Sequence, residues 1–153
     1  MENEVPVLEC VYRTELGDFK LFIRSFTRKQ FETLARKHRR PFTDKKTRKT
    51  EMEIDNETYY PALCRSVVEK FEDLTEEVKA LVMREPVPSN GTDPKAIVPF
   101  TWDVMIGMYR TSTKLAEYVE AIAMNFEDVL GEQRLAEREA RNNAKVLKQE
   151  VPN

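Results

Sequence analysis

The chain has 153 residues and a mass of 17.9 kDa, which is close to the size of a single domain. Hydrophobic residues make up 41% of it, enough for a buried core, and charged residues make up 34%, above the average of about 25%. With 25 basic and 27 acidic residues the net charge is −2, so the whole chain lacks the positive field of a general nucleic-acid binder. Only four glycines are present, which argues against a barrel, a propeller or a glycine-rich phosphate loop.

No apolar run approaches the roughly 20 residues that a membrane-spanning helix needs. The first residues, Met1 to Glu4, are acidic, and no apolar secretion signal follows them. We therefore expect a soluble intracellular protein with no membrane partner. In that setting Cys10 and Cys64 are expected to be reduced thiols, buried as small hydrophobic side chains.

Two alternating segments begin the chain and predict a β-hairpin. Residues 6–13 and 19–24 alternate between apolar and polar positions, and a short loop containing Gly17 separates them. The apolar positions on one face are Leu8, Cys10, Tyr12, Phe19, Leu21 and Ile23. Because a two-stranded ribbon is marginally stable alone, another element is expected to cover this face.

A first helix is expected directly after the hairpin. Thr27 and Gln30 have the spacing of a capping box, and Phe26 and Phe31 that of a hydrophobic staple. Pro41 is expected to end this region. Residues 47–54 alternate weakly and predict either a third strand or an ordered loop.

A second helix is predicted to begin near residues 58–60, which would place Pro61 in its first turn. Its apolar face follows helical spacing through Tyr60, Leu63, Cys64, Val67, Val68 and Phe71. Asp73 and Glu76 are expected to cap a further short helix. Residues 85–99 are rich in proline and predict a long loop.

A third helix is expected to start near Thr101 and to continue to about residue 130. Apolar residues recur along it at spacings of three and four, as in a helix packed on a domain. After Gly131 the apolar pattern fades and residues 132–150 become rich in charge. This end of the chain is expected to be either a helical extension or a disordered tail.

The sequence offers little catalytic or metal-binding chemistry. His38 is the one histidine, and it lies among cations with no nearby carboxylate to orient it. The histidine and two cysteines are too few and too widely spaced for a zinc site, and no nucleotide-binding or metalloprotease motif is present. We therefore expect a protein that is not an enzyme and uses no metal or other cofactor.

A basic segment lies within residues 36–49, where the one acidic residue is Asp44. Its cations are Arg36, Lys37, Arg39, Arg40, Lys45, Lys46, Arg48 and Lys49. The segment is either a site for phosphates or an acidic protein surface, or a solvated connector. Phe42 is the one aromatic residue within it, which is little for stacking on single-stranded nucleic acid.

A candidate partner-binding surface comes from the apolar residues of the later helices. Its members are Phe71, Leu74, Trp102, Met105, Tyr109 and Phe126. Such stripes form either an internal core or an exposed groove for a partner. One hairpin and about three helices are few elements to cover every apolar face, so a partner protein or a second copy of the chain is expected to cover one.

The order of these patterns resembles the small tail assembly chaperones of long-tailed bacteriophages. The resemblance rests on the hairpin strand at 17–24, the capped helix at 25–34, the helical stretch at 59–74 and the helix start at 99–103. It covers roughly residues 17–130.

The resemblance implies a helper protein in the host cytoplasm that binds the tape-measure protein and brings tail-tube subunits to it. It also implies that a longer form is made by frameshifting near the charged end. Two alternatives stay open: a nucleic-acid-binding module that uses residues 36–49, and a structural phage subunit.

The predicted fold is α+β and mostly helical. An N-terminal β-hairpin packs on a body of three to four helices. Residues 1–130 are expected to form a single globular domain, and residues 131–153 a charged helical or disordered tail.

Overall fold

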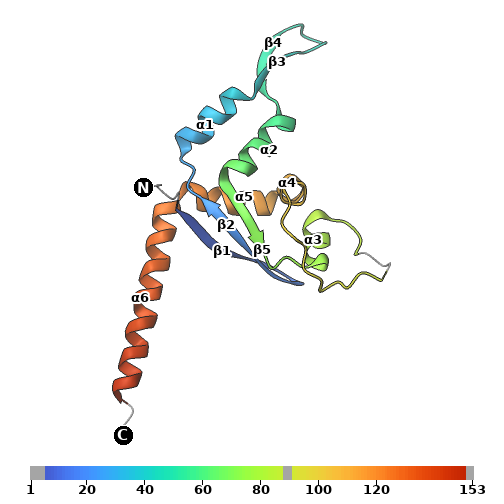
Figure 1. Ribbon diagram of the computed structural model, residues 1–153. Coiled ribbons are helices and arrows are strands. Elements are labelled where there is room, and N and C mark those ends of the chain that lie inside the picture. The colour runs from blue at the N-terminus through green and yellow to red at the C-terminus, as the bar shows by residue number, and fades with distance from the viewer. Residues whose placement is uncertain (1–5, 88–90, 151–153) are drawn as a thin grey trace, which may run out of the picture.

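The computed structural model describes residues 6–87 and 91–150, with side chains as far as residue 145. Within this part the chain is α+β, with an N-terminal hairpin followed mainly by helices, as the sequence predicts. Figure 1 shows three parts: a small sheet backed by helices, a narrow hairpin projecting at one end, and a long C-terminal helix.

The main sheet contains three antiparallel strands. β1 (Val7–Thr14) pairs with β2 (Gly17–Arg24), and β2 pairs with β5 (Val68–Glu72), which gives the order β1-β2-β5. All six predicted inward residues of the hairpin are buried. Gly17 has a φ of 145° at the start of β2, a conformation that glycine adopts without a Cβ penalty.

β1 is an edge strand whose outward carbonyls are partly satisfied by side chains. The Tyr118 hydroxyl donates to the Val11 carbonyl at 3.0 Å, and Gln133 Nε2 donates to the Glu9 carbonyl at 3.3 Å. These contacts attach the later helices to the edge of the sheet.

The second helix, α2 (Asn56–Val67), is shorter at its C-terminal end than predicted, and the prediction for Val68 and Phe71 was wrong. Both residues lie in β5, where the register against β2 shifts between Phe22 and Ile23. This irregularity turns two residues three positions apart toward the same side, which imitates a helical spacing.

The caps of two helices also differ from the sequence prediction. Asp55 accepts a hydrogen bond from the Glu57 N–H at 3.2 Å, so α2 starts directly after it and Pro61 lies inside the helix. Thr75 caps α3 (Glu76–Met83) and accepts from the Val78 N–H, whereas Asp73 was the predicted cap. In both places the residue one step before the helix supplies the acceptor that the first N–H groups need.

α1 (Arg28–Lys37) begins as predicted. Thr27 and Gln30 form the reciprocal capping box, and the rings of Phe26 and Phe31 pack edge to face with centroids 4.7 Å apart. Because no residue of α1 is fully buried, this helix is held by its cap and by its half-buried stripe.

The predicted helix of residues 101–130 is three helices. α4 (Trp102–Thr111), α5 (Thr113–Met124) and α6 (Phe126–Glu150) follow one another with single-residue breaks. Thr101 caps α4 as predicted, and Ser112 ends α4 and caps α5 by accepting from the Leu115 N–H at 3.1 Å. Each break lets the chain turn while its apolar residues still face the core.

The core lies between the sheet and helices α2, α4 and α5, with α3 packed on α4. Figure 1 shows α2, α4 and α5 grouped beside the sheet. The largest fully buried side chains come from both layers: Phe19, Phe71, Phe126, Leu8, Leu21, Ile23, Leu63, Leu74, Met105, Met108, Leu115 and Val67. Residues 91–101 lead into α4, and a bridge between Thr75 and Ile97 joins them to the start of α3.

The charged end of the chain is helical. Figure 1 shows α6 leaving the body and projecting away from it. Of its residues 131–145, Gln133 is half-buried and the others are exposed. The division into a domain at 1–130 and a tail at 131–153 stays a prediction, and residues 151–153 lie outside the described part.

Within residues 6–87 and 91–150, no helix combines the length and the apolar character needed to cross a bilayer.

Candidate partner-binding surface

Most of the predicted partner-binding residues belong to the core. Five of the six have 2% exposure or less: Phe71, Leu74, Met105, Tyr109 and Phe126. The prediction of an exposed groove at these positions was therefore wrong. The reason is that these residues share one core cluster with the inward side chains of the main sheet, so the apolar seam meets the sheet and the neighbouring helices instead of solvent.

Trp102 is the one member of that set that is half-buried. Its ring lies between Phe100, with centroids 5.1 Å apart, and the Arg65 guanidinium, 5.1 Å from its centroid. The Trp102 ring thus has an aromatic and a cation–π contact within the chain itself.

The basic segment forms a second sheet, separate from the first. β3 (Arg39–Thr43) and β4 (Thr50–Ile54) pair as an antiparallel hairpin in which all ten strand residues are exposed. Of the two alternatives predicted for residues 47–54, a strand or an ordered loop, residues 50–54 form a strand, and its partner strand at 39–43 was not foreseen. We call residues 39–54 the basic arm, and Figure 1 shows it extending beyond α1 and α2.

The base of the basic arm is tied to α2. The Asp55 N–H donates to the His38 carbonyl at 2.6 Å, and His38 Nδ1 is 2.9 Å from the Thr58 hydroxyl. Arg40 pairs with Asp55 at 3.8 Å. His38 thus holds the arm to the body, which gives it a structural role.

The eight predicted cations lie on the last turn of α1 and along the basic arm, and all are exposed. Within the described residues, Arg40 alone among them forms an ion pair. The whole chain carries −2 and residues 36–49 carry +7, so the remainder carries −9. The arm is therefore a positive projection on a negative body.

One face of the basic arm carries three apolar residues, Pro41, Met52 and Ile54. In the hairpin register Pro41 is opposite Met52 and Arg39 is opposite Ile54, so these residues share a face. Met52 is 59% exposed and Ile54 is 39% exposed. A two-stranded ribbon with one uncovered apolar face gains stability when another surface packs on it.

A groove of about 380 Å³ runs beside α1. Its floor includes Phe26 and Leu34, and Lys29 and Lys37 lie along it. The lining is completed by Thr27, Gln30, Thr33 and Ser66. The groove and the basic arm thus both combine accessible apolar residues with cationic side chains.

The two cysteine thiols, Cys10 and Cys64, are buried and poorly suited to act as nucleophiles. Burial raises the pKa of Cys64 to about 12, and burial together with the Glu9 carboxylate raises that of Cys10 to about 11. Both therefore stay protonated at neutral pH. Among the residues that the structure describes, no three potential metal ligands gather at one point.

The chain matches no protein-family model, no curated protein and no solved structure.

The sequence reasoning missed the groove beside α1 and the apolar face of the basic arm. A signal for the arm was present, because Pro41, Met52 and Ile54 are apolar residues within an otherwise charged stretch. The groove carried no comparable signal, since it depends on how far α1 stands from α2.

Proposed function

We propose that this protein is a non-enzymatic tail assembly chaperone of a long-tailed bacteriophage. It binds the tape-measure protein in the host cytoplasm and helps to recruit tail-tube subunits. Two arguments support this: the ordered sequence resemblance, and the presence of an exposed surface that the chain's own fold leaves uncovered.

The observation that carries the proposal is the basic arm. All ten of its strand residues are exposed, and one of its faces carries the apolar residues Pro41, Met52 and Ile54. Most of the residues at which the sequence led us to expect an uncovered apolar surface are buried, and accessible apolar residues lie instead on the arm and beside α1. We assign partner binding to the arm and to the groove at Phe26 and Leu34.

The chemistry of this surface defines the partner. An apolar floor flanked by cations fits an amphipathic helix whose polar side is acidic. A long helical tape-measure protein would offer many amphipathic segments of this kind. Packing of its apolar side on Met52 and Ile54 removes apolar area from water, while its carboxylates meet the lysines.

Co-expression with the tape-measure protein followed by affinity capture tests the proposal. We expect a stable complex that survives purification at micromolar concentration. Met52→Ser, which changes only the apolar face of the arm, should reduce the complex, and Leu135→Ser on the distant helix α6 is the matched control because Leu135 is also exposed. Absence of any complex with the unmodified chain contradicts the proposal.

A nucleic-acid-binding module is the second candidate, favoured by the eight exposed cations on α1 and the arm. Binding of this kind weakens steeply with salt and falls when Arg39, Arg40, Lys45 and Lys46 are neutralised. Binding that is absent, or insensitive to salt, removes this candidate. Mass spectrometry of purified phage particles separates a chaperone, which should be missing from them, from a structural subunit.

A further inference from the structure

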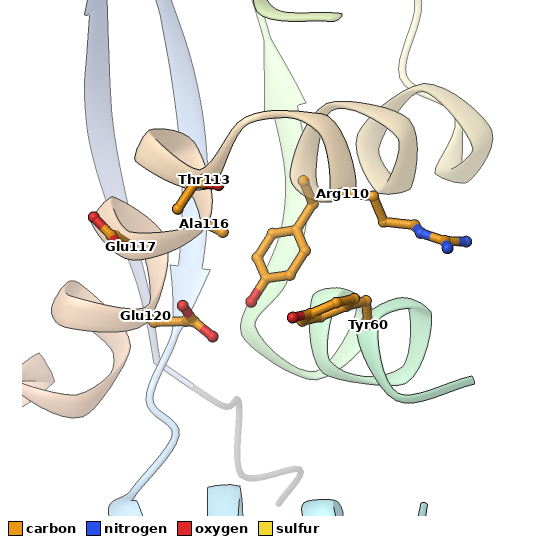
Figure 2. Close-up of a pocket in the computed structure, with 7 residues that line it drawn as sticks. Tyr60, Arg110, Thr113, Ala116, Glu117 and Glu120 are labelled. Carbon is orange, nitrogen blue, oxygen red and sulfur yellow. The ribbon is translucent and has the colours of Figure 1, made fainter. Parts of the chain in front are cut away.

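A second hollow lies away from the basic arm, where α2, α4 and α5 meet. It encloses about 240 Å³ and is lined by Tyr60, Tyr109, Arg110, Thr113, Ala116, Glu117 and Glu120. Figure 2 shows Glu120 and Tyr60 facing each other across the opening, whereas Arg110 and Glu117 point away from it. The interior is therefore rich in oxygen atoms.

The Tyr109 hydroxyl is an unpartnered polar group at this site. Tyr109 is 2% exposed, and its oxygen makes no hydrogen bond within the described residues. A buried hydroxyl without a partner is costly and uncommon in native structures, so it indicates a group that arrives from outside. The Glu120 carboxylate and the hydroxyls of Tyr60, Tyr109 and Thr113 can all accept hydrogen bonds, so a group that offers several donors fits the hollow.

The charge of the hollow selects a cation. Within residues 6–87 and 91–145, no basic side chain pairs with Glu117 or Glu120. Burial raises the pKa of the Glu120 carboxyl, and the nearby Tyr109 hydroxyl opposes that effect. A cation beside Glu120 favours the ionised carboxylate and offsets the effect of burial, whereas an anion would be repelled.

The shape of the lining distinguishes between cations. Tyr60 is 37% exposed, so part of its ring is available for stacking. A guanidinium is planar, stacks on aromatic rings and offers five donors, enough for a carboxylate and for the hydroxyls of Tyr60, Tyr109 and Thr113. An ammonium offers three donors and no planar face.

We propose that this hollow binds a guanidinium group, presented as an arginine side chain by a protein that docks over α2 and α5. The assignment is independent of the proposed tail assembly role. It concerns a different surface and a different ligand chemistry, so either proposal can fail without the other.

Amide NMR spectra of the full chain, titrated with Nα-acetyl-argininamide, test this assignment. We expect saturable shifts at Tyr60, Tyr109 and the first turns of α5. The matched probes are Nα-acetyl-lysinamide, which should bind several-fold more weakly, and Nα-acetyl-norleucinamide, which should not bind.

Three variants locate the effect. Glu120→Gln keeps the shape and removes the charge, and should weaken binding about tenfold. Tyr109→Phe removes one of the hydroxyls that a guanidinium would contact and should weaken binding about threefold. Glu139→Gln, an exposed carboxylate on α6 that does not line the hollow, should leave affinity unchanged.

Three results would overturn the assignment. They are no saturable shift up to roughly 50 mM probe, equal binding of the norleucine derivative, and equal loss in the Glu139 and Glu120 variants. The last result would mean that the carboxylates act only through overall charge.

Discussion

Removal of the basic arm separates folding from partner binding. Residues 40–53 are replaced by Asn-Gly, so that a two-residue turn connects Arg39 to Ile54. These two residues are opposite each other in the hairpin register, and the Asp55 N–H and His38 carbonyl below them are 2.6 Å apart. A two-residue Asn-Gly turn is the preferred closure for such a pair.

The effect on stability follows from what the arm contacts. The excision removes no core side chain, and the one ion pair lost is Arg40–Asp55, in which Arg40 is 67% exposed and which is worth less than about 1 kcal/mol. The shorter loop lowers the entropic cost of closing it by roughly 1 kcal/mol, which stabilises the folded chain and offsets the lost ion pair. The free energy of unfolding should therefore change by no more than about 1 kcal/mol, or about 2–4 °C in Tm.

The effect on binding should be large. If the arm forms the partner surface, its loss should weaken capture of the tape-measure protein at least tenfold, equivalent to about 1.4 kcal/mol. Thermal unfolding followed by circular dichroism and capture by the tagged chain are the two assays. Unchanged capture by a folded arm-less chain refutes the assignment of the arm, and loss of the fold refutes the claim that the arm stands apart from the core.

Three further predictions concern the body of the protein. Phe126→Ala should lower the free energy of unfolding by about 3–5 kcal/mol in urea titrations because it leaves a cavity in the core, and a cost below about 1 kcal/mol would contradict its burial. Thr27→Ala should cost about 1 kcal/mol, since it removes the acceptor of the Gln30 N–H, and Thr33→Ala on the exposed side of the same helix is the control. Cys10 and Cys64 should react with a thiol reagent only on unfolding. Because their folded pKa values, about 11 and about 12, exceed the unfolded value of 9.0, the unfolded thiols ionise first, and each should reduce stability by about 1.4 kcal/mol per pH unit above pH 9 until its folded pKa is reached. A chain equally stable at pH 8 and pH 10 would contradict this expectation.

Local sequence signals determined several elements of this protein correctly. The hairpin of β1 and β2 follows from strict alternation, and the start of α1 follows from Thr27 and Gln30. Such features depend on residues that are neighbours along the chain, so the sequence contains all the information needed.

Other features depended on contacts between distant segments. Val68 and Phe71 have helical spacing, yet pairing with β2 makes them part of a strand, because a free strand edge offers their backbone groups partners. Packing of the helices against the sheet and against one another likewise buried five of the six residues expected to bind a partner. Sequence spacing identified those residues as apolar, but only the packing of the sheet against the helices decided that they face inward.

For the candidate binding surfaces too, some features were evident from the sequence and others only from the structure. The cations of residues 36–49 were evident as a charge cluster, whereas the apolar face of the arm required the register between β3 and β4. The hollow at Glu120 could not be foreseen from sequence, since it brings together residues as far apart in the chain as Tyr60 and Glu120. The sequence by itself thus determined composition, charge and local elements, and the tertiary structure decided exposure, because burial is a property of pairs of surfaces and not of single segments.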